Sequence, residues 1–108
     1  MIALSLSEIA EAVSGRLVLG ASGKTSETVI DGLSQTDSRE VEAGQVFFAR
    51  RGEETDGHRF VAKAVDNGAA LLVVEREIED RVPQIVVADS TDALGALATE
   101  AVRRVNEA

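Results

Sequence analysis

Two aliphatic runs constrain the fold of this 108-residue chain more than any other feature of its sequence. AALLVV (69–74) and QIVVAD (84–89) are short and almost continuously apolar, instead of alternating between apolar and polar residues. Such runs are typical of strands that are buried on both faces in α/β proteins. Because segments with helical periodicity precede and follow them, the pattern predicts one three-layer α/β domain without internal repeats.

The chain is expected to open with a short amphipathic helix over residues 5–15. Ser5 and Glu8 are spaced as a capping box at its start, and Gly15 suits the C′ position at its end. The apolar face of this helix is expected to comprise Leu6, Ile9, Ala12 and Val13.

Two further helices are expected in the second half of the chain. One spans residues 59–68 with Gly68 as its C-cap, and the other spans 91–108 after a cap at Asp89 or Ser90. The first is expected to bury Phe60, Val61, Ala64 and Val65, and the second carries an apolar stripe of Leu94, Leu97, Ala98, Ala101, Val102 and Val105.

A Gly-Lys-Thr triplet formed by Gly23, Lys24 and Thr25 matches the end of an ATP-binding P-loop. The full motif would require a glycine at position 18, which holds Val18. The segment after the triplet is rich in β-branched residues, so no helix N-terminus is expected to receive phosphate there. We therefore interpret the triplet as part of a polar turn and rank a small P-loop enzyme last among the candidate functions. The strands flanking this turn are expected over 16–19 and 27–33.

The composition excludes several classes of protein. The absence of cysteine excludes a disulfide framework and thiolate metal sites. The net charge of −8 argues against a nucleic-acid partner, and aromatic residues, the usual stacking platforms for bases, are only 3% of the chain. The opening MIALSLSE lacks the basic region and the long apolar run of a signal peptide, and no apolar run approaches the roughly 20 residues of a membrane helix, so we expect a cytoplasmic protein without membrane insertion.

Two polar loops, over 34–45 and 51–58, flank a short apolar strand expected over 46–50. Residues 37–63 carry five basic and six acidic groups, a net charge of −1, whereas the rest of the chain carries −7. This arginine-bearing stretch could receive a small anion, although interspersed surface charges explain it equally well. Ligands of open α/β sheets bind beyond strand ends, so the two loops are the candidates for function.

The first loop offers Thr36, Ser38 and Arg39, whose hydroxyl and guanidinium groups suit phosphate and carbonyl oxygens. The second offers backbone N–H groups around Gly52, together with Asp56 and His58. These residues alone indicate an anion-binding or nucleotide-sugar-binding module. Such a module could be free-standing or regulatory.

The segment TDSREVEAGQVFFARRGEETDGHRFVAKAVDNGAALLVV (36–74) resembles the N-terminal domain of the Mur ligases. The family pattern is Asp-Ser-Arg, then Gly-Asp-Leu-Phe-Val-Ala-x-x-Gly, then Asp-Gly-His, a short helix and Gly-Ala. The resemblance covers nearly the whole chain, with departures at Gln45-Val46, where the family has Asp-Leu, and at Phe48. The opening and closing helices are more similar to the ligases that add D-alanyl-D-alanine than to the siblings that add the third peptide residue.

The resemblance implies a three-layer α/β/α fold with a small mixed sheet. It also implies that residues 1–108 are one domain, the UDP-binding N-terminal domain of a three-domain ligase, without the central ATP-binding and C-terminal domains. The implied partners are a UDP-N-acetylmuramoyl-peptide and the other two domains, and the implied pathway is peptidoglycan precursor synthesis. ATP and Mg²⁺ are implied for the full-length enzyme only, and this segment is predicted to be inactive alone, without catalytic or metal-binding residues.

By position, the resemblance places Thr36 and Ser38 among residues that contact the uridine diphosphate, with Arg39 beside them. The residues that match a loop closing over the uracil are Glu53, Glu54 and Thr55.

Structural roles are alternatives for three residues in these loops. Asp37 could form an internal pair with Arg39 that shapes the first loop. Asp56 could cap the helix that begins near Gly57. His58 is the only histidine, and without ligand-spaced companions it is better interpreted as a turn-packing residue than as a metal ligand or catalytic base.

Overall fold

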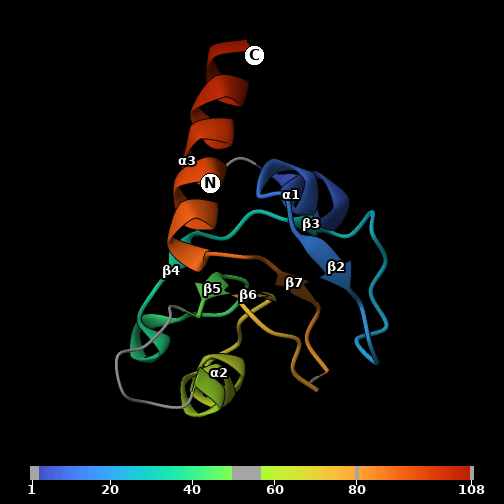
Figure 1. The fold of residues 1–108 in the computed structure, drawn as a ribbon, viewed down its shortest axis with the longest axis vertical. Coiled ribbons are helices and arrows are strands. Elements are labelled where there is room, and N and C mark those ends of the chain that lie inside the picture. Colours follow the sequence, from blue (N-terminus) through green and yellow to red (C-terminus); the bar gives the residue numbers. More distant parts are fainter. Residues whose placement is uncertain (1–2, 50–56, 80, 108) are drawn as a thin grey trace.

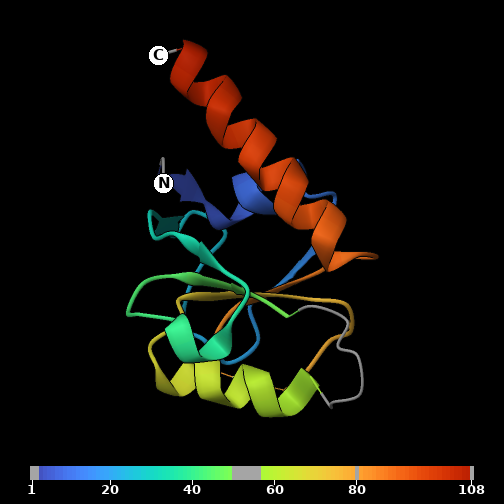
Figure 2. The same ribbon diagram turned by 90° about the vertical axis from the view of Figure 1, so that its left-hand side faces the viewer.

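The computed structural model describes residues 3–49, 57–79 and 81–107, which form three layers. Helices α1 (Leu6–Ala12) and α3 (Ser90–Glu107) lie on one side of a central sheet, and α2 (Gly57–Asp66) lies on the other (Figures 1 and 2). This arrangement confirms the predicted α/β/α architecture.

The central sheet is mixed and has the strand order β2-β7-β6-β5-β4. Its last four strands in this order run parallel to one another, whereas β2 runs antiparallel to β7. A separate antiparallel pair is formed by β1 (Leu4–Ser5) and β3 (Val29–Ile30). The strands of the central sheet are β2 (Arg16–Val18), β4 (Ser34–Gln35), β5 (Val46–Phe48), β6 (Leu71–Val74) and β7 (Gln84–Val86).

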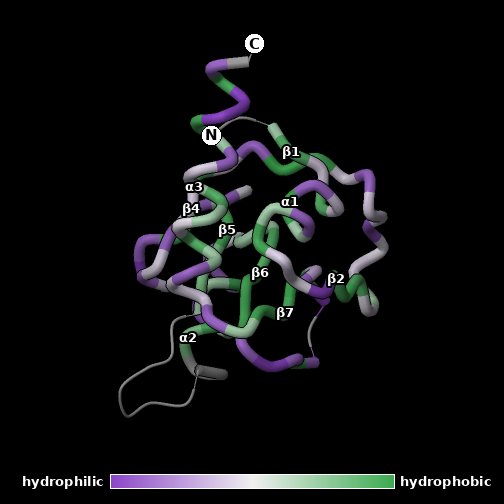
Figure 3. The backbone as a smooth tube through the Cα atoms, turned by 45° about the horizontal axis from the view of Figure 1, so that its top comes forward, coloured by the Kyte–Doolittle hydropathy of each residue, from purple (hydrophilic) through white to green (hydrophobic). Residues whose placement is uncertain are grey.

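The inner strands β5, β6 and most of β7 are buried on both faces, as their apolar runs predict. Alternate residues of β5 and β6 divide between two apolar clusters, and Figure 3 shows hydrophobic colour concentrated on these central strands. The cluster beneath α1 and α3 contains Val46, Phe48, Leu71, Val73 and Ile85, and the cluster above α2 contains Phe47, Leu72 and Val74.

Helix α1 begins with the predicted capping box. The backbone N–H of Ser5 donates to Glu8 Oε1 at 2.9 Å, and the N–H of Glu8 donates to Ser5 Oγ at 3.1 Å. At the other end the prediction is wrong by one residue, because Ser14, not Gly15, adopts the left-handed conformation, with φ 55°. The N–H of Gly15 then reaches the carbonyl of Ala10, so Gly15 is the second residue beyond the cap.

Helix α2 ends at Asp66, and Gly68, the predicted terminating glycine, follows with a φ of +100°. Its buried face comprises Val61 and Ala64, with Val65 partly buried. The expectation that Phe60 points inward is wrong, because this side chain is 42% exposed. Phe60 lies one 100° step away from Val61 around the helix, at the edge of the stripe that meets the sheet.

Helix α3 is capped by Asp89, whose Oδ1 accepts from the N–H of Asp92 at 2.9 Å. Its first half packs on the sheet through Ala93 and Leu97, which are buried. The outer part of the predicted stripe is not buried, because Val102 and Val105 are 61% and 60% exposed. Figure 2 shows the reason, since the second half of α3 extends beyond the sheet and away from α2. Ala98 is exposed as well.

No helix in the described part of the chain is long and apolar enough to cross a membrane.

Candidate functional site

The segment 34–45, which contains Thr36 and Ser38, begins with a strand that the sequence does not predict. Residues 34–45 were expected to be a loop, but Ser34 and Gln35 form β4, which pairs in parallel with β5. The register sets Gln35 beside Phe47, so Thr36 follows β4 at the edge where the chain leaves β5. Parallel pairing therefore brings the predicted contact residues of the first loop to the same edge of the sheet as the start of the second loop.

A 3-10 helix, η1 (Ser38–Glu40), follows at this edge and is shaped by Asp37. Asp37 Oδ1 accepts from the backbone N–H of Arg39 at 2.9 Å. The guanidinium of Arg39 also donates two hydrogen bonds to the same carboxylate, from Nε to Oδ1 at 3.1 Å and from Nη2 to Oδ2 at 2.8 Å. The internal pair between Asp37 and Arg39 is thus present, as the structural alternative for these residues predicts.

This pair alters the acid–base properties of both partners. The hydrogen bonds from the side chain and backbone of Arg39 lower the pKa of Asp37 from 3.8 to about 2. The carboxylate in turn raises the pKa of Arg39. Asp37 is therefore an anion at neutral pH, and the local charge of the pair is balanced even though the Arg39 side chain is 79% exposed.

Thr36 and Ser38 differ in exposure. Thr36 is exposed at the end of β4, whereas Ser38 is only 4% exposed. Within the described part of the chain, the Ser38 hydroxyl forms no hydrogen bond, and no fully buried side-chain oxygen or nitrogen lacks a partner. The Ser38 hydroxyl oxygen is consequently not completely buried.

Several predictions in the second loop fall outside the described residues. These are the uracil-loop residues Glu53, Glu54 and Thr55 and the helix cap at Asp56. His58 lies in the first turn of α2, but its side chain is not described, so its turn-packing role also stays a prediction.

The turn that contains Gly23, Lys24 and Thr25 does not have the architecture of a P-loop. The N–H of Thr25 donates to Thr28 Oγ1 at 3.1 Å, and Thr25 Oγ1 accepts from the N–H of Glu27 at 3.2 Å. The next element is strand β3, which joins β1 in the separate sheet. A P-loop would instead open a helix whose N-terminus faces the phosphates, so this turn does not fit ATP.

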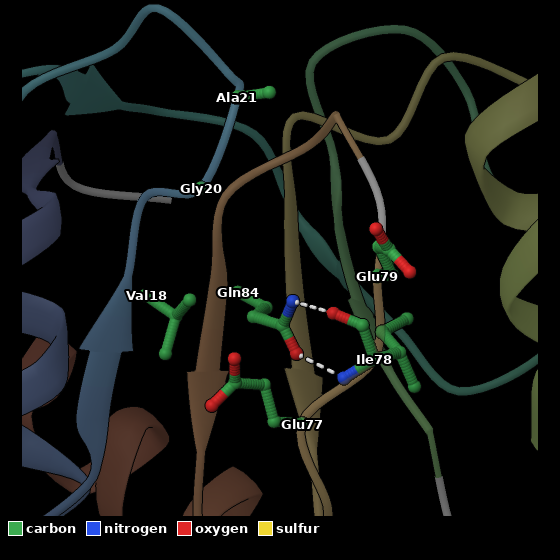
Figure 4. Close-up of a pocket in the computed structure, with 7 residues that line it drawn as sticks. All are labelled: Val18, Gly20, Ala21, Glu77, Ile78, Glu79 and Gln84. Atoms are coloured by element: carbon green, nitrogen blue, oxygen red, sulfur yellow. Dashed lines mark hydrogen bonds between the residues drawn. The ribbon is translucent and has the colours of Figure 1, made fainter.

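A pocket beside this turn is also unsuited to an anionic nucleotide. Figure 4 shows that Glu77 and Glu79 contribute carboxylates to it, and Gln84 holds the backbone N–H and carbonyl of Ile78 at 2.9 and 2.6 Å. Gln84 opens β7, so the pocket lies toward the amino ends of the parallel strands, at the edge opposite Thr36. The remaining lining residues are Val18, Gly20 and Ala21.

No group of three or more carboxylate or imidazole side chains within the described residues is arranged to hold a metal ion.

Comparison with known proteins identifies the family. The family model described as "Mur ligase family, catalytic domain" matches residues 33–101. The chain is 36% identical over 107 residues to the UDP-N-acetylmuramoyl-tripeptide–D-alanyl-D-alanine ligase of Haemophilus influenzae, covering 98% of this chain and 22% of that enzyme. It is 45% identical over 64 residues to the UDP-N-acetylmuramoyl-L-alanyl-D-glutamate–2,6-diaminopimelate ligase of Aquifex aeolicus, covering 59% of this chain and 13% of the relative.

Solved structures agree with these sequence matches. A crystal structure of MurF from Acinetobacter baumannii superposes with a TM-score of 0.72 at 36% identity, over 90% of this chain and 20% of that one. A MurF ligase from Thermotoga maritima in complex with ADP superposes with a TM-score of 0.56 at 37% identity, over 66% of this chain and 17% of that one. The chain thus spans about a fifth or less of the length of these relatives. It belongs to the Mur ligase family.

Proposed function

We propose that this domain binds the uridine diphosphate end of a UDP-N-acetylmuramoyl-peptide. The domain would serve an ATP-dependent ligase that adds D-alanyl-D-alanine in cytoplasmic peptidoglycan precursor synthesis. The observation that carries the proposal is the parallel pairing of β4 with β5, which sets Thr36 and Ser38 at the edge where the chain leaves β5. Glu53, Glu54 and Thr55 follow β5 in the sequence and lie outside the described residues.

The chemistry at this edge suits a nucleotide diphosphate. The hydroxyls of Thr36 and Ser38 can donate to phosphate or uracil oxygens and accept from the uracil N–H. Two of the five N–H donors of the Arg39 guanidinium bond to Asp37, and the remaining donors can reach a phosphate because the side chain is exposed. Because Asp37 neutralises Arg39, hydrogen-bond geometry contributes more to recognition here than net positive charge.

The D-alanyl-D-alanine assignment is supported by coverage. The Haemophilus influenzae relative that adds this dipeptide aligns over 98% of the chain, whereas the diaminopimelate ligases align over 58–70%. The diaminopimelate ligases are more identical within the shared segment, at up to 47%, and this favours them as the alternative. A full-length enzyme that releases ADP with D-alanyl-D-alanine and not with diaminopimelate would support the first assignment, and the converse would establish the second.

We assign ATP and Mg²⁺ to other domains of the full-length ligase. There ATP would activate the substrate carboxylate as an acyl phosphate before the incoming amine attacks. The turn with Lys24 does not fit ATP, and we derive no catalytic step from the residues of this domain.

An NMR titration of the labelled 108-residue chain tests the binding proposal. UDP-N-acetylmuramoyl-tripeptide should shift the amide signals of Thr36, Ser38 and residues 53–55, and ATP should shift none of the signals of residues 20–27. The proposal would be contradicted by ATP-dependent shifts confined to the amide signals of residues 20–27. It would also be contradicted if the substrate shifted no signals around Thr36.

Substitution of Ser38 provides a second test, in the full-length ligase. Ser38→Ala should raise the KM for the UDP-linked substrate by about tenfold through the loss of one hydrogen bond to a charged ligand. The thermal melting of the domain should change little, because the hydroxyl bonds to no other residue in the described part of the chain. An unchanged KM would remove Ser38 from the site.

A further inference from the structure

The segment that carries Thr36 and Ser38 is attached to the C-terminal end of α2. Asn67 lies just beyond α2, and its Nδ2 donates to the backbone carbonyl of Ser38 at 3.0 Å. These residues are 29 positions apart, so the bond joins two separate elements of the fold. Figure 2 shows the short coil of η1 lying along α2.

Backbone contacts hold the other end of the same segment. The N–H of Gly44 donates to the carbonyl of Gly68 at 3.0 Å, and the N–H of Ala70 donates to the carbonyl of Gln45 at 2.8 Å. Gly68 also approaches closely, since a Cβ there would lie 2.8 Å from the Cα of Ala43. The segment is therefore fixed at residues 43–45 by backbone, and Asn67 fixes it near the predicted ligand contacts.

Asn67 ties Ser38 to a different element of the fold, whereas the Asp37–Arg39 pair acts within η1. The Arg39 side chain is mostly in solvent, where an ion pair contributes little. The bond from Asn67 is partly buried, and a carbonyl that lost it would be left desolvated without that partner. The N–H of the same peptide group donates to Asp37 Oδ1, so Asn67 and Asp37 hold the peptide between Ser38 and Arg39 from its two sides, and the backbone that carries the Ser38 hydroxyl is fixed.

We propose that Asn67 is a positioning residue of the UDP site. It acts through Ser38 and does not touch the ligand. The inference rests on the proposed function, and it predicts that removing the amide donor of Asn67 weakens binding of the UDP-linked substrate while the fold is retained.

The test compares three variants of the 108-residue chain by titration with UDP-N-acetylmuramoyl-tripeptide. Asn67→Ala removes the side-chain amide, and Asn67→Asp keeps its shape but replaces the donor with an acceptor. Asn106→Ala is the matched control, because Asn106 is exposed near the end of α3. We expect the dissociation constant to rise about three- to tenfold in Asn67→Ala, at least as much in Asn67→Asp, and not at all in the control.

Two measurements separate positioning from a general loss of stability. Urea unfolding gives the folded fraction of each variant, and affinities are compared where every variant is folded. The carbonyl ¹³C signal of Ser38 in the free domain reports the lost hydrogen bond directly. In the full-length ligase, the KM for the UDP-linked substrate should rise while the KM for ATP and kcat remain unchanged, which a merely destabilised enzyme would not show.

The outcomes also separate this inference from the proposed function. A wild-type chain that does not bind the substrate overturns both. If the wild type binds and both Asn67 variants bind as tightly as the wild type does, although the Ser38 carbonyl signal has shifted, the positioning role alone is overturned. If both variants lose affinity while the Asn106 control does not, the positioning role is supported.

Discussion

At the scale of single residues, the carboxylate of Asp37 has the most strongly organised surroundings in the candidate site. It receives one backbone and two side-chain hydrogen bonds, all from Arg39. Because the pair is exposed, its main effect is to set the shape of η1 and not to stabilise the whole domain. In this 3-10 helix the backbone carbonyl of Ser38 accepts a hydrogen bond from Asn67 Nδ2.

Removal of the Arg39 guanidinium should raise the pKa of Asp37. In Arg39→Gln, we expect this pKa to rise from about 2 toward 3.8 but to remain below it, because the backbone N–H of residue 39 still donates. A carboxyl-¹³C NMR titration measures the change. Arg16→Gln is the control, because Arg16 lies in β2 and Asp37 follows β4, and these are the first and last strands of the sheet. An equal rise of the Asp37 pKa in that variant would contradict the assignment to Arg39.

The lowered pKa of Asp37 also predicts how the stability of the domain changes with pH. A carboxylate whose pKa is depressed in the folded state stabilises the fold above its unfolded pKa, near 3.9. This contribution is lost as the pH falls from about 4 to about 2, and it should be smaller in Arg39→Gln. Unfolding free energies measured across this range should therefore converge for the two proteins at low pH.

Two glycines should respond to alanine in opposite directions. A Cβ at Gly15 would lie 2.3 Å from Ile85 Cγ2, so Gly15→Ala should lower the free energy of unfolding by about 1–3 kcal/mol. Gly95 lies within α3, with no atom near its missing Cβ, so Gly95→Ala should raise it by about 0.5–1 kcal/mol. Urea unfolding of both variants checks the pair, and a stabilising Gly15→Ala would contradict the close packing against β7.

At the scale of elements, Glu8 joins α1 to α3 while also closing the capping box. Its Oε1 accepts from Ser5, and its Oε2 pairs with Arg104 Nη1 at 2.9 Å. Arg104 contacts Glu100 as well, so the pairing reaches the second half of α3. The backbone hydrogen bond from Ser5, followed by the bond from Arg104, lowers the pKa of Glu8.

Loss of the cap hydroxyl should destabilise α1. Ser5→Ala is expected to lower the free energy of unfolding by about 1 kcal/mol, because the N–H of Glu8 loses its acceptor at the start of the helix. Ser7→Ala is the control, since Ser7 is exposed and, among the described residues, its hydroxyl bonds only to the Ser5 hydroxyl. Equal losses in chemical denaturation of the two variants would contradict the capping role.

Elements with a local chemical signature could be predicted from the sequence, and elements defined by a distant partner could not. The capping box at Ser5 and the helix end at Gly68 depend on residues within a few positions, and both are confirmed. Strand β4 has only two polar residues, so it carries no periodicity, and its pairing with β5 defines it. The contact of Asn67 with Ser38 was missed for the same reason.

At the scale of the whole molecule, the sheet determines how much of α3 is buried. The stripe that includes Leu97, Val102 and Val105 is continuous in the sequence, but the short strands cover only its first half. Periodicity predicts which face of a helix is apolar, and it contains no information about the width of the surface beneath it. The exposed outer half is thus a property of the assembled layers.

This arrangement predicts unequal costs along one helix. Leu97→Ala should lower the free energy of unfolding by about 2–5 kcal/mol, because a fully buried side chain leaves a cavity among α1, α3 and the sheet. The double substitution Val102→Thr with Val105→Thr should change it by less than about 0.5 kcal/mol, because both side chains are already mostly in water. Urea unfolding of the 108-residue chain measures both. A double variant as destabilised as Leu97→Ala would mean that the Val102 and Val105 side chains pack against the domain in solution.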